Sequence, residues 1–256
     1  MCLILLAYKS HPQYKMILAA NRDEFLDRPS KGAHFWEDYP NVLAGQDERH
    51  GGAWLGVNKY GRLAALTNYR KLPQDEDRRY KSRGQLVKNY LTGHQNAFAY
   101  LFDVSQQYKE YKPFNLLLGE EDSLYYFCSE QREISEITSP GIYGLSNHLL
   151  DTPWPKVEQG KRELEKAVFR DRFDLEDLFA ILANQDEVEE EQLPETGLDW
   201  RWERALAKVF VSHENYATVS STVILWGWDN HIELIERTYR SGVDDYQDKA
   251  FAFQVA

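Results

Sequence analysis

Residues 1–24 read MCLILLAYKSHPQYKMILAANRDE, and this stretch decides the fold. Two apolar runs, residues 3–8 and 14–20, lie on either side of a polar, proline-containing segment at residues 9–13. Short apolar runs separated by a five-residue turn predict an antiparallel hairpin. The second run ends abruptly in Asn-Arg-Asp-Glu, so the hairpin closes on a cluster of polar side chains.

The expected register of this hairpin places a thiol beside that cluster. If Tyr8 and Tyr14 flank the turn, the numbers of paired residues sum to about 22. Cys2 then lies opposite Ala20, one residue from the start of the polar segment at 21–24. The sequence therefore predicts an active site in which the Cys2 thiol lies near an amide and two carboxylates.

Cys2 is suited to nucleophilic catalysis by its position. Removal of Met1, which is usual before a small second residue, would place the thiol and a free α-amine on one residue. An α-amine has a pKa near ~8, so near neutral pH part of it is unprotonated and accepts the thiol proton. The alternative is an inert core residue, because cysteine is among the most often buried residue types. The combination of second position, strand start and facing polar segment favours the nucleophile.

Several further blocks of sequence resemble the NRDE family, also called the transport and Golgi organisation family. Besides the initial Met-Cys, these blocks are AANRDEF at 19–25, RPS at 28–30, GGAWLG at 51–56, AALTNYR at 64–70, YGLSN at 143–147 and TPW at 152–154. More distantly, Met-Cys, an Asn-x-Asp after the second strand and a later Ser-Asn are similar to choloylglycine-type hydrolases. That second resemblance implies the N-terminal-nucleophile hydrolase class.

Strand-like segments at both ends of the chain, with helical segments between them, predict an α+β fold. We expect two packed antiparallel sheets flanked by helices, in a single domain over residues 1–256. That the arrangement is an αββα sandwich, like that of N-terminal-nucleophile hydrolases, is implied by the resemblance. Residues 25–45, interrupted by two prolines and a glycine, are expected to form a loop that carries His34, Phe35 and Trp36. Thr152 is expected to cap a helix whose first residue is Pro153.

The resemblance assigns roles to the polar residues of the predicted site. Asn68 is the expected oxyanion donor and Asn147 positions the substrate or the nucleophile. Asp23 holds the α-amine, and Asn21 or Arg22 orients it. The alternatives stay open, because Asn at a strand end is commonly turn chemistry and Arg22 with Asp23 is compatible with a weak surface ion pair.

The sequence departs from the family pattern near its C-terminal strands. The family has Tyr-Gly-Thr-Arg-Ser-Ser-Thr there, whereas this chain has YATVSST at 216–222. Val219 therefore stands where the family has arginine. A substrate carboxylate or phosphate would need another partner, and Arg237 is the candidate.

Composition excludes other classes of protein. The net charge of −11 disfavours nucleic acid as a partner. No apolar run approaches the ~20 residues of a transmembrane helix, and the N-terminal region lacks a signal peptide's positive segment. Two cysteines, Cys2 and Cys128, are compatible with a reducing compartment, so a cytoplasmic location is expected. The seven histidines show no metal-ligand spacing, so no metal site is predicted.

We expect the partner to be a small molecule, and three functions are compatible with the sequence. The sequence does not indicate an oligomeric state. The first is hydrolysis of a small amide C–N bond by Cys2, which requires no cofactor. The second is haem trafficking, implied by the family resemblance, and the third is lipid or acyl-CoA binding without catalysis. The residues assigned to substrate or haem are His34, His50 or Cys2 as iron ligands, with Trp36, Trp54 and Tyr69 facing a flat ring.

Overall fold

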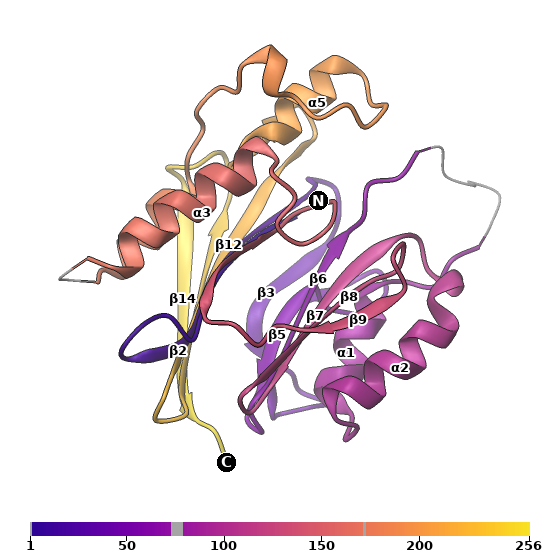
Figure 1. Cartoon of the computed structure of the whole chain (residues 1–256), viewed down its shortest axis with the longest axis vertical. Coiled ribbons are helices and arrows are strands. Elements are labelled where there is room, and N and C mark those ends of the chain that lie inside the picture. Colours follow the sequence, from indigo (N-terminus) through magenta and orange to yellow (C-terminus); the bar gives the residue numbers. More distant parts are fainter. Residues whose placement is uncertain (1, 73–78, 171–172) are drawn as a thin grey trace. The chain divides into compact units, whose positions relative to one another are not determined.

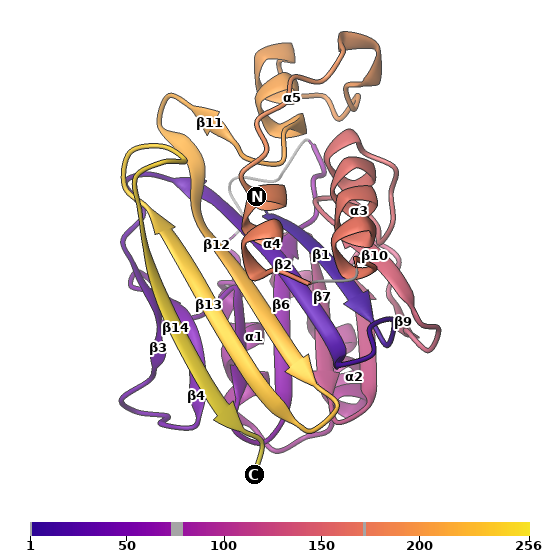
Figure 2. The same cartoon turned by 90° about the vertical axis from the view of Figure 1, so that its left-hand side faces the viewer.

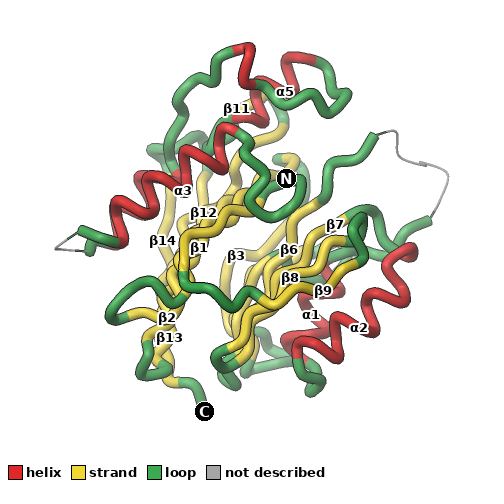
Figure 3. The backbone as a smooth tube through the Cα atoms, in the orientation of Figure 1, coloured by secondary structure: helices red, strands yellow, loops and turns green. Residues whose placement is uncertain are grey.

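The computed structural model describes residues 2–72, 79–170 and 173–256. The chain forms two compact units, drawn in Figures 1 and 3. The first unit contains residues 1–27 and 139–253, and the second contains residues 28–138 and 254–256. The second unit is thus inserted in the sequence of the first. The expectation of a single domain over residues 1–256 stays a prediction.

The first unit is built on a seven-stranded sheet (Figure 2). Six of its strands lie in the order β10-β1-β2-β12-β13-β14, and the seventh, β11, pairs with β12. The strands are β1 (Cys2–Tyr8), β2 (Tyr14–Phe25), β10 (Gly141–Leu145), β11 (Ser212–His213), β12 (Tyr216–Gly227), β13 (His231–Tyr239) and β14 (Tyr246–Gln254). The long strands β2 and β12 pair antiparallel along almost their whole length. The N-terminal hairpin is therefore joined to the C-terminal hairpin at the centre of the sheet.

Helices cover one face of this sheet. They are α3 (Pro155–Val168) and α4 (Leu175–Leu182), while α5 (Trp200–Ala207) and the 3₁₀ turn η2 (Glu190–Gln192) follow later in the chain. Odd-numbered residues of β1 and β2, such as Leu5 and Ile17, share a buried apolar cluster with Leu164 and Phe179 of these helices. Because side chains alternate along a strand, even-numbered residues of β1 and β2 point to the opposite face.

The predicted N-terminal hairpin is confirmed, but its predicted register is wrong by two residues. Paired residue numbers sum to 24, so that Cys2 lies opposite Arg22 and not opposite Ala20. The turn explains the difference. The ring Nδ1 of His11 accepts hydrogen bonds from the backbone N–H groups of Gln13 and Tyr14. The Lys9 N–H donates to Lys15 O at 2.8 Å. The turn is therefore closed by residues 9 and 15.

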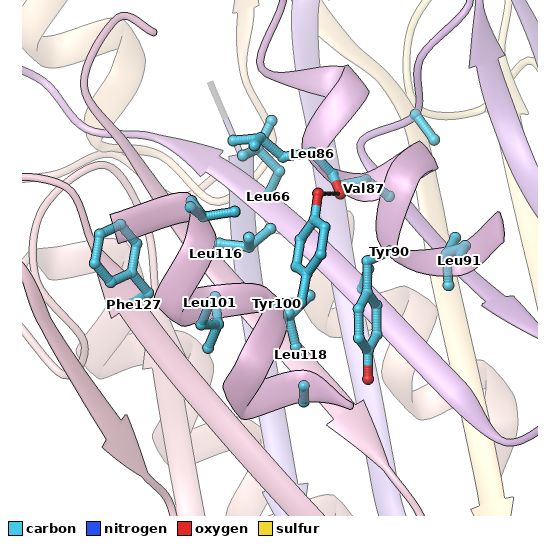
Figure 4. Close-up of a cluster of buried hydrophobic side chains, with 14 of the residues drawn as sticks. Leu66, Leu86, Val87, Tyr90, Leu91, Tyr100, Leu101, Leu116, Leu118 and Phe127 are labelled. Carbon is cyan, nitrogen blue, oxygen red and sulfur yellow. Dashed lines mark hydrogen bonds between the residues drawn. The ribbon is translucent and has the colours of Figure 1, made fainter. Parts of the chain in front are cut away.

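The second unit has a seven-stranded sheet in sequential order from β3 to β9. Its strands are β3 (Ser30–Phe35), β4 (Val42–Asp47), β5 (Leu55–Asn58), β6 (Arg62–Asn68), β7 (Phe114–Glu120), β8 (Ser123–Cys128) and β9 (Glu133–Glu136). Helices α1 (Gly84–Thr92) and α2 (Ala97–Gln107), followed by the 3₁₀ turn η1 (Tyr108–Glu110), pack on the sheet. Their core is shown in Figure 4, where the Tyr100 hydroxyl donates to Leu86 O at 2.8 Å.

Two local expectations are corrected. Residues 25–45 are not a loop, because they contain β3 and the start of β4, paired antiparallel. The edge strand β3 carries a register irregularity between Lys31 and His34, so it lacks the regular alternation that identifies a strand. Helix α3 begins at Pro155, with Trp154 as N-cap, because a second proline two residues after Pro153 supplies the helical start.

The predicted fold class, α+β with two antiparallel sheets flanked by helices, is confirmed. Among the described residues, no helix is both long enough and apolar enough to cross a membrane.

Candidate active site

Three neighbouring strands of the first unit place the predicted nucleophile in a row of polar side chains. Cys2 begins β1 and pairs with Arg22 of β2, which in turn pairs with Ser220 of β12. Directly opposed residues of antiparallel strands point to the same face. The register of β1 with β10 pairs Ile4 with Leu145, and its continuation by two residues brings the segment after β10 level with Cys2.

The Cys2 residue is partly exposed, but its thiol is buried next to the backbone of Asp23. Burial of the thiol raises its pKa, and the negative charge of Asp23 adds to this effect. The charge of Arg22 and a hydrogen bond from the backbone of Asp23 act in the opposite direction without overcoming burial. In the full chain, burial therefore disfavours the thiolate form of Cys2.

Asp23 is almost completely buried, with 1% of its surface exposed. Thr218 donates a hydrogen bond from its hydroxyl to Asp23 Oδ1 at 2.7 Å, and Tyr216 donates to the Asp23 backbone carbonyl at 2.7 Å. Burial raises the pKa of the Asp23 carboxyl, although the nearby charge of Lys156 lowers it. Lys156, near the start of α3, is itself only 1% exposed. The site thus places a buried lysine near a buried carboxyl group.

Asn21 holds neighbouring segments together on the helix-covered face of the sheet. It pairs with Leu3, and its amide donates to Leu182 O at 2.8 Å and to Val209 O at 2.9 Å. Its carbonyl oxygen accepts a hydrogen bond from Ser221 at 2.5 Å. These contacts fix the end of α4 and the segment before β12 against β2. Its predicted role in orienting the α-amine stays a prediction.

Asn147 lies close to Cys2 through its neighbour Ser146. The Ser146 hydroxyl is within 3.1 Å of Cys2 O and 3.3 Å of Asn147 Oδ1. Asn147 is completely buried. Cys2, Arg22, Asp23 and Asn147 are therefore brought together at one end of the first unit's sheet.

Arg237 lies on β13 with its guanidinium already engaged. It donates to both carboxylate oxygens of Asp248 at 2.9 Å and to Glu176 Oε1 at 3.1 Å. Its guanidinium also lies 4.2 Å from the Phe179 ring centroid and 3.8 Å from that of Tyr246. A substrate anion would have to compete with two carboxylates for this arginine.

The remaining predicted residues belong to the second unit. Asn68 ends β6, opposite Phe114, and its predicted role as oxyanion donor stays a prediction. The Trp54 ring packs over Gly45, where an added Cβ would lie 2.3 Å from the ring. Burial raises the pKa of Tyr69, which is half-buried.

Apart from Cys2, the residues assigned to a haem site also lie in the second unit, and two of them are not in exposed loops. His34 is half-buried in β3, with its Nδ1 2.8 Å from Gly32 O. Trp36 is 3% exposed, and its ring belongs to the core of the second unit. Its indole N–H donates to Ala44 O at 3.1 Å. His50 is exposed, and its Nδ1 lies 3.1 Å from Asp47 Oδ2. The described residues contain no cluster of His, Cys, Asp and Glu side chains suited to a metal ion.

Four residues of the site were given no role of their own in the sequence analysis. Thr218 and Tyr216 belong to the YATVSST block, whose departure from the family pattern draws attention to Val219 instead. Lys156 had no signal, because a lysine in the first turn of an amphipathic helix normally points to solvent. Ser146 precedes Asn147 and was noted only as part of the Ser-Asn pair.

Comparison with solved structures defines the class of the fold. The C2A mutant of the conjugated bile acid hydrolase from Clostridium perfringens aligns with 100% of this chain and 98% of its own, with a TM-score of 0.51 and 10% sequence identity. This likeness, together with the two antiparallel sheets and their helices, shows an N-terminal-nucleophile hydrolase-like fold.

Comparison of sequences then gives the family. Residues 1–241 match the family described as Transport and Golgi organisation 2. The Transport and Golgi organization protein 2 homologs of Bos taurus and Homo sapiens are 37% and 36% identical to this chain, and each comparison covers 93% of both sequences. The chain belongs to the Transport and Golgi organisation 2 family, as the NRDE resemblance predicted.

Proposed function

We propose that this protein is an N-terminal cysteine hydrolase that cleaves a small amide C–N bond. The observation that carries the proposal is the position of Cys2, whose thiol lies beside the buried Asp23 and opposite Arg22. The bile acid hydrolase of similar fold carries a substitution at its own cysteine in position two. That substitution supports comparing the two cysteines.

The mechanism requires the α-amine of Cys2, which removal of Met1 would release. The amine takes the thiol proton, and the sulfur attacks the amide carbonyl to form a tetrahedral intermediate. The protonated amine then gives its proton to the leaving nitrogen, so that the C–N bond breaks and a thioester forms on Cys2. Water attacks the thioester with the amine as base, which releases the acid and restores the thiol.

The surroundings of Cys2 fit the two states of this amine. The buried carboxylate of Asp23, held by Thr218, stabilises a positive charge that appears on the amine during each step. Arg22 favours the thiolate form of Cys2 through its positive charge. Because burial keeps the thiol pKa high in the chain that retains Met1, cleavage of Met1 is expected to act as the activating step.

The test is an alkylation experiment on the two cysteines, which differ in their surroundings. Cys2 is partly exposed at the end of a strand, whereas Cys128 is completely buried in the second unit. The protein is incubated with iodoacetamide at neutral pH and the adducts are mapped by mass spectrometry, which also shows whether Met1 is present. We expect selective labelling of Cys2 over Cys128 in the processed chain.

The matched control carries a short N-terminal extension that keeps the nitrogen of Cys2 in an amide bond. Labelling of Cys2 should fall steeply in this control, because the thiol loses its internal base while remaining in place. A Cys2→Ser variant should show no adduct at position 2. Equal labelling of Cys2 and Cys128, or no labelling of Cys2 in processed protein, would rule out the hydrolase.

Haem trafficking, implied by the family resemblance, stays a prediction. The ring nitrogens described above for His34 and His50 already lie near protein oxygens, so no described contact favours an iron ligand at either histidine. A haem titration with a saturable Soret shift that is lost on His50→Ala or Cys2→Ala would support it. Lipid or acyl-CoA binding likewise stays a prediction.

A further inference from the structure

A β-bulge in β12 changes the direction of two hydroxyl groups at the site. Thr218 pairs with Asp23 and Ser220 pairs with Arg22, so Val219 is an extra residue on β12. Residues two apart in a regular strand point to the same face, but the extra residue shifts this alternation. The Thr218 hydroxyl consequently reaches Asp23 on one face, while Ser220 lies on the opposite face with Arg22.

The hydroxyl of Ser220 is the unusual member of this arrangement. Ser220 is 5% exposed, and its Oγ has no hydrogen-bond partner among the residues that the structure describes. Burying a hydroxyl without a partner is unfavourable, and such groups are few in native proteins. Thr218, two residues earlier, both donates to Asp23 and accepts from Val211 N–H at 2.9 Å.

The distance from Cys2 limits what Ser220 does. Arg22 lies between them in the cross-strand row, and adjacent strands are about 4.8 Å apart, so Ser220 is about 10 Å from Cys2 along the sheet. An oxyanion donor must lie about 3 Å from the reacting oxygen, which excludes Ser220 from that role. A group of the substrate several bonds away from the cleaved carbonyl would lie at the right distance.

We infer that Arg22 and Ser220 form a subsite that binds an anionic oxygen group of the substrate on the same face as Cys2. This inference rests on the proposed function. Arg22 is 7% exposed, and its guanidinium forms an ion pair with the Glu24 carboxylate at 3.9 Å, so a substrate anion would bind beside that carboxylate. A guanidinium with an adjacent hydroxyl donor is suited to a carboxylate or a phosphate. The substrate class is therefore a small acyl amide that carries such an anion within a few bonds of the cleaved carbonyl.

Binding to the full chain with Cys2→Ala tests the subsite without any catalysis. Three probes of similar shape are titrated calorimetrically: N-acetylglycine, N-acetylaminomethylphosphonate and the neutral N-acetylglycinamide. We expect at least one anion to bind more tightly than the neutral amide, and the preferred anion distinguishes a carboxylate from a phosphate subsite. Adding Ser220→Ala should reduce this preference about tenfold, the usual effect of a hydrogen bond to a charged group.

Two further variants make the result specific. Ser220→Thr keeps a hydroxyl and should restore most of the preference, whereas Ser105→Ala, at a half-buried serine of α2 in the second unit, should leave it unchanged. Equal binding of the three probes, or an anion preference that survives Ser220→Ala, would overturn the subsite. Absence of detectable binding by all three would overturn it as well.

A separate measurement distinguishes failure of the subsite from failure of the hydrolase. Iodoacetamide is small and neutral, so its reaction with Cys2 should be the same with and without Ser220→Ala. If iodoacetamide does not label Cys2 but the anion preference depends on Ser220, the subsite stands on a protein that only binds. If Cys2 is labelled but Ser220→Ala changes nothing, the hydrolase stands and the subsite is wrong.

Discussion

Asp23 and Asp47 are buried carboxylates at the ends of strands, one in each unit, and their surroundings shift their pKa in opposite directions. Burial raises the pKa of both. At Asp47, hydrogen bonds from Arg28 at 2.8 Å and from His50 at 3.1 Å outweigh burial, so that the pKa is lowered. At Asp23, Lys156 and the Thr218 hydroxyl do not outweigh burial, so that the pKa is raised.

The difference separates a structural anion from a candidate functional one. Asp47 gains enough hydrogen bonds to be stable as a carboxylate, and it ties the β4 turn to neighbouring residues. Asp23 is held in a position where its charge is disfavoured until another cation comes close. Perturbation of this kind is concentrated at functional sites, and here the cation proposed to come close is the amine of Cys2.

The largest expected effect is the loss of the buried cation. Lys156→Met should destabilise the protein by about 3–5 kcal/mol, because it removes one member of a buried charge pair. Arg28→Met is the matched change beside Asp47, and it should cost less than about 1 kcal/mol because that pair is partly exposed. Urea unfolding at pH 7 measures both.

A double variant tests whether the loss arises from the pair. Adding Asp23→Asn to Lys156→Met should recover most of the lost stability, since no buried charge then remains without its counterpart. If Lys156→Met costs no more than Arg28→Met, the two carboxylates do not differ as described.

The next effect is on the pH dependence of stability, and its sign differs between the two carboxylates. The pKa of Asp23 is raised in the folded protein. Its contribution to the stability of the fold is therefore fully present below the unfolded pKa and is lost as pH rises through the folded pKa. The folded pKa of Asp47 is lowered, so its contribution is present above the unfolded pKa and is lost as pH falls through the folded pKa. Each unit of difference between folded and unfolded pKa corresponds to about 1.36 kcal/mol.

Unfolding free energies between pH 3 and 8 check these signs, for the parent and for Asp23→Asn and Asp47→Asn. As pH rises, the stability of the Asp23→Asn variant relative to the parent should increase, and the relative stability of the Asp47→Asn variant should decrease. Parallel curves for the two variants would contradict the comparison.

The sequence predicted the elements of the site better than their alignment. The hairpin and its polar end were visible because apolar runs and turn residues are local signals. The register was not visible, because it depends on how His11 accepts hydrogen bonds within the turn. The observed register supports the predicted site more strongly than the predicted register did, since it brings Cys2 two residues closer to Asp23.

What the sequence could not predict depends on contacts between distant segments. Lys156 reads as a surface lysine, and only the docking of α3 on the sheet buries it near Asp23. The bulge at Val219 has no local signal in a run of β-branched and small residues. Arg237 was expected to face a substrate, but Asp248 lies on β14, whose approach to β13 was not evident from spacing.

A smaller effect is expected from the hydroxyl beside Asp23. Thr218→Val keeps the shape of the side chain but removes a donor to Asp23 and an acceptor for Val211 N–H. Leaving a buried group unsatisfied costs about 1–3 kcal/mol, so the midpoint of urea unfolding should fall with an unchanged slope. An unchanged midpoint would mean that Asp23 does not depend on this hydroxyl.

The smallest effect is expected on the other side of the bulge, at Ser220. Its hydroxyl is buried without a partner among the described residues, so Ser220→Ala removes an unfavourable group and no hydrogen bond. The stability should change by less than about 0.5 kcal/mol or increase slightly. The same substitution should weaken anion binding, so stability and binding should respond separately. A loss of stability as large as that of Thr218→Val would mean that the hydroxyl already has a structural partner, and Ser220 would then not be kept available for a substrate.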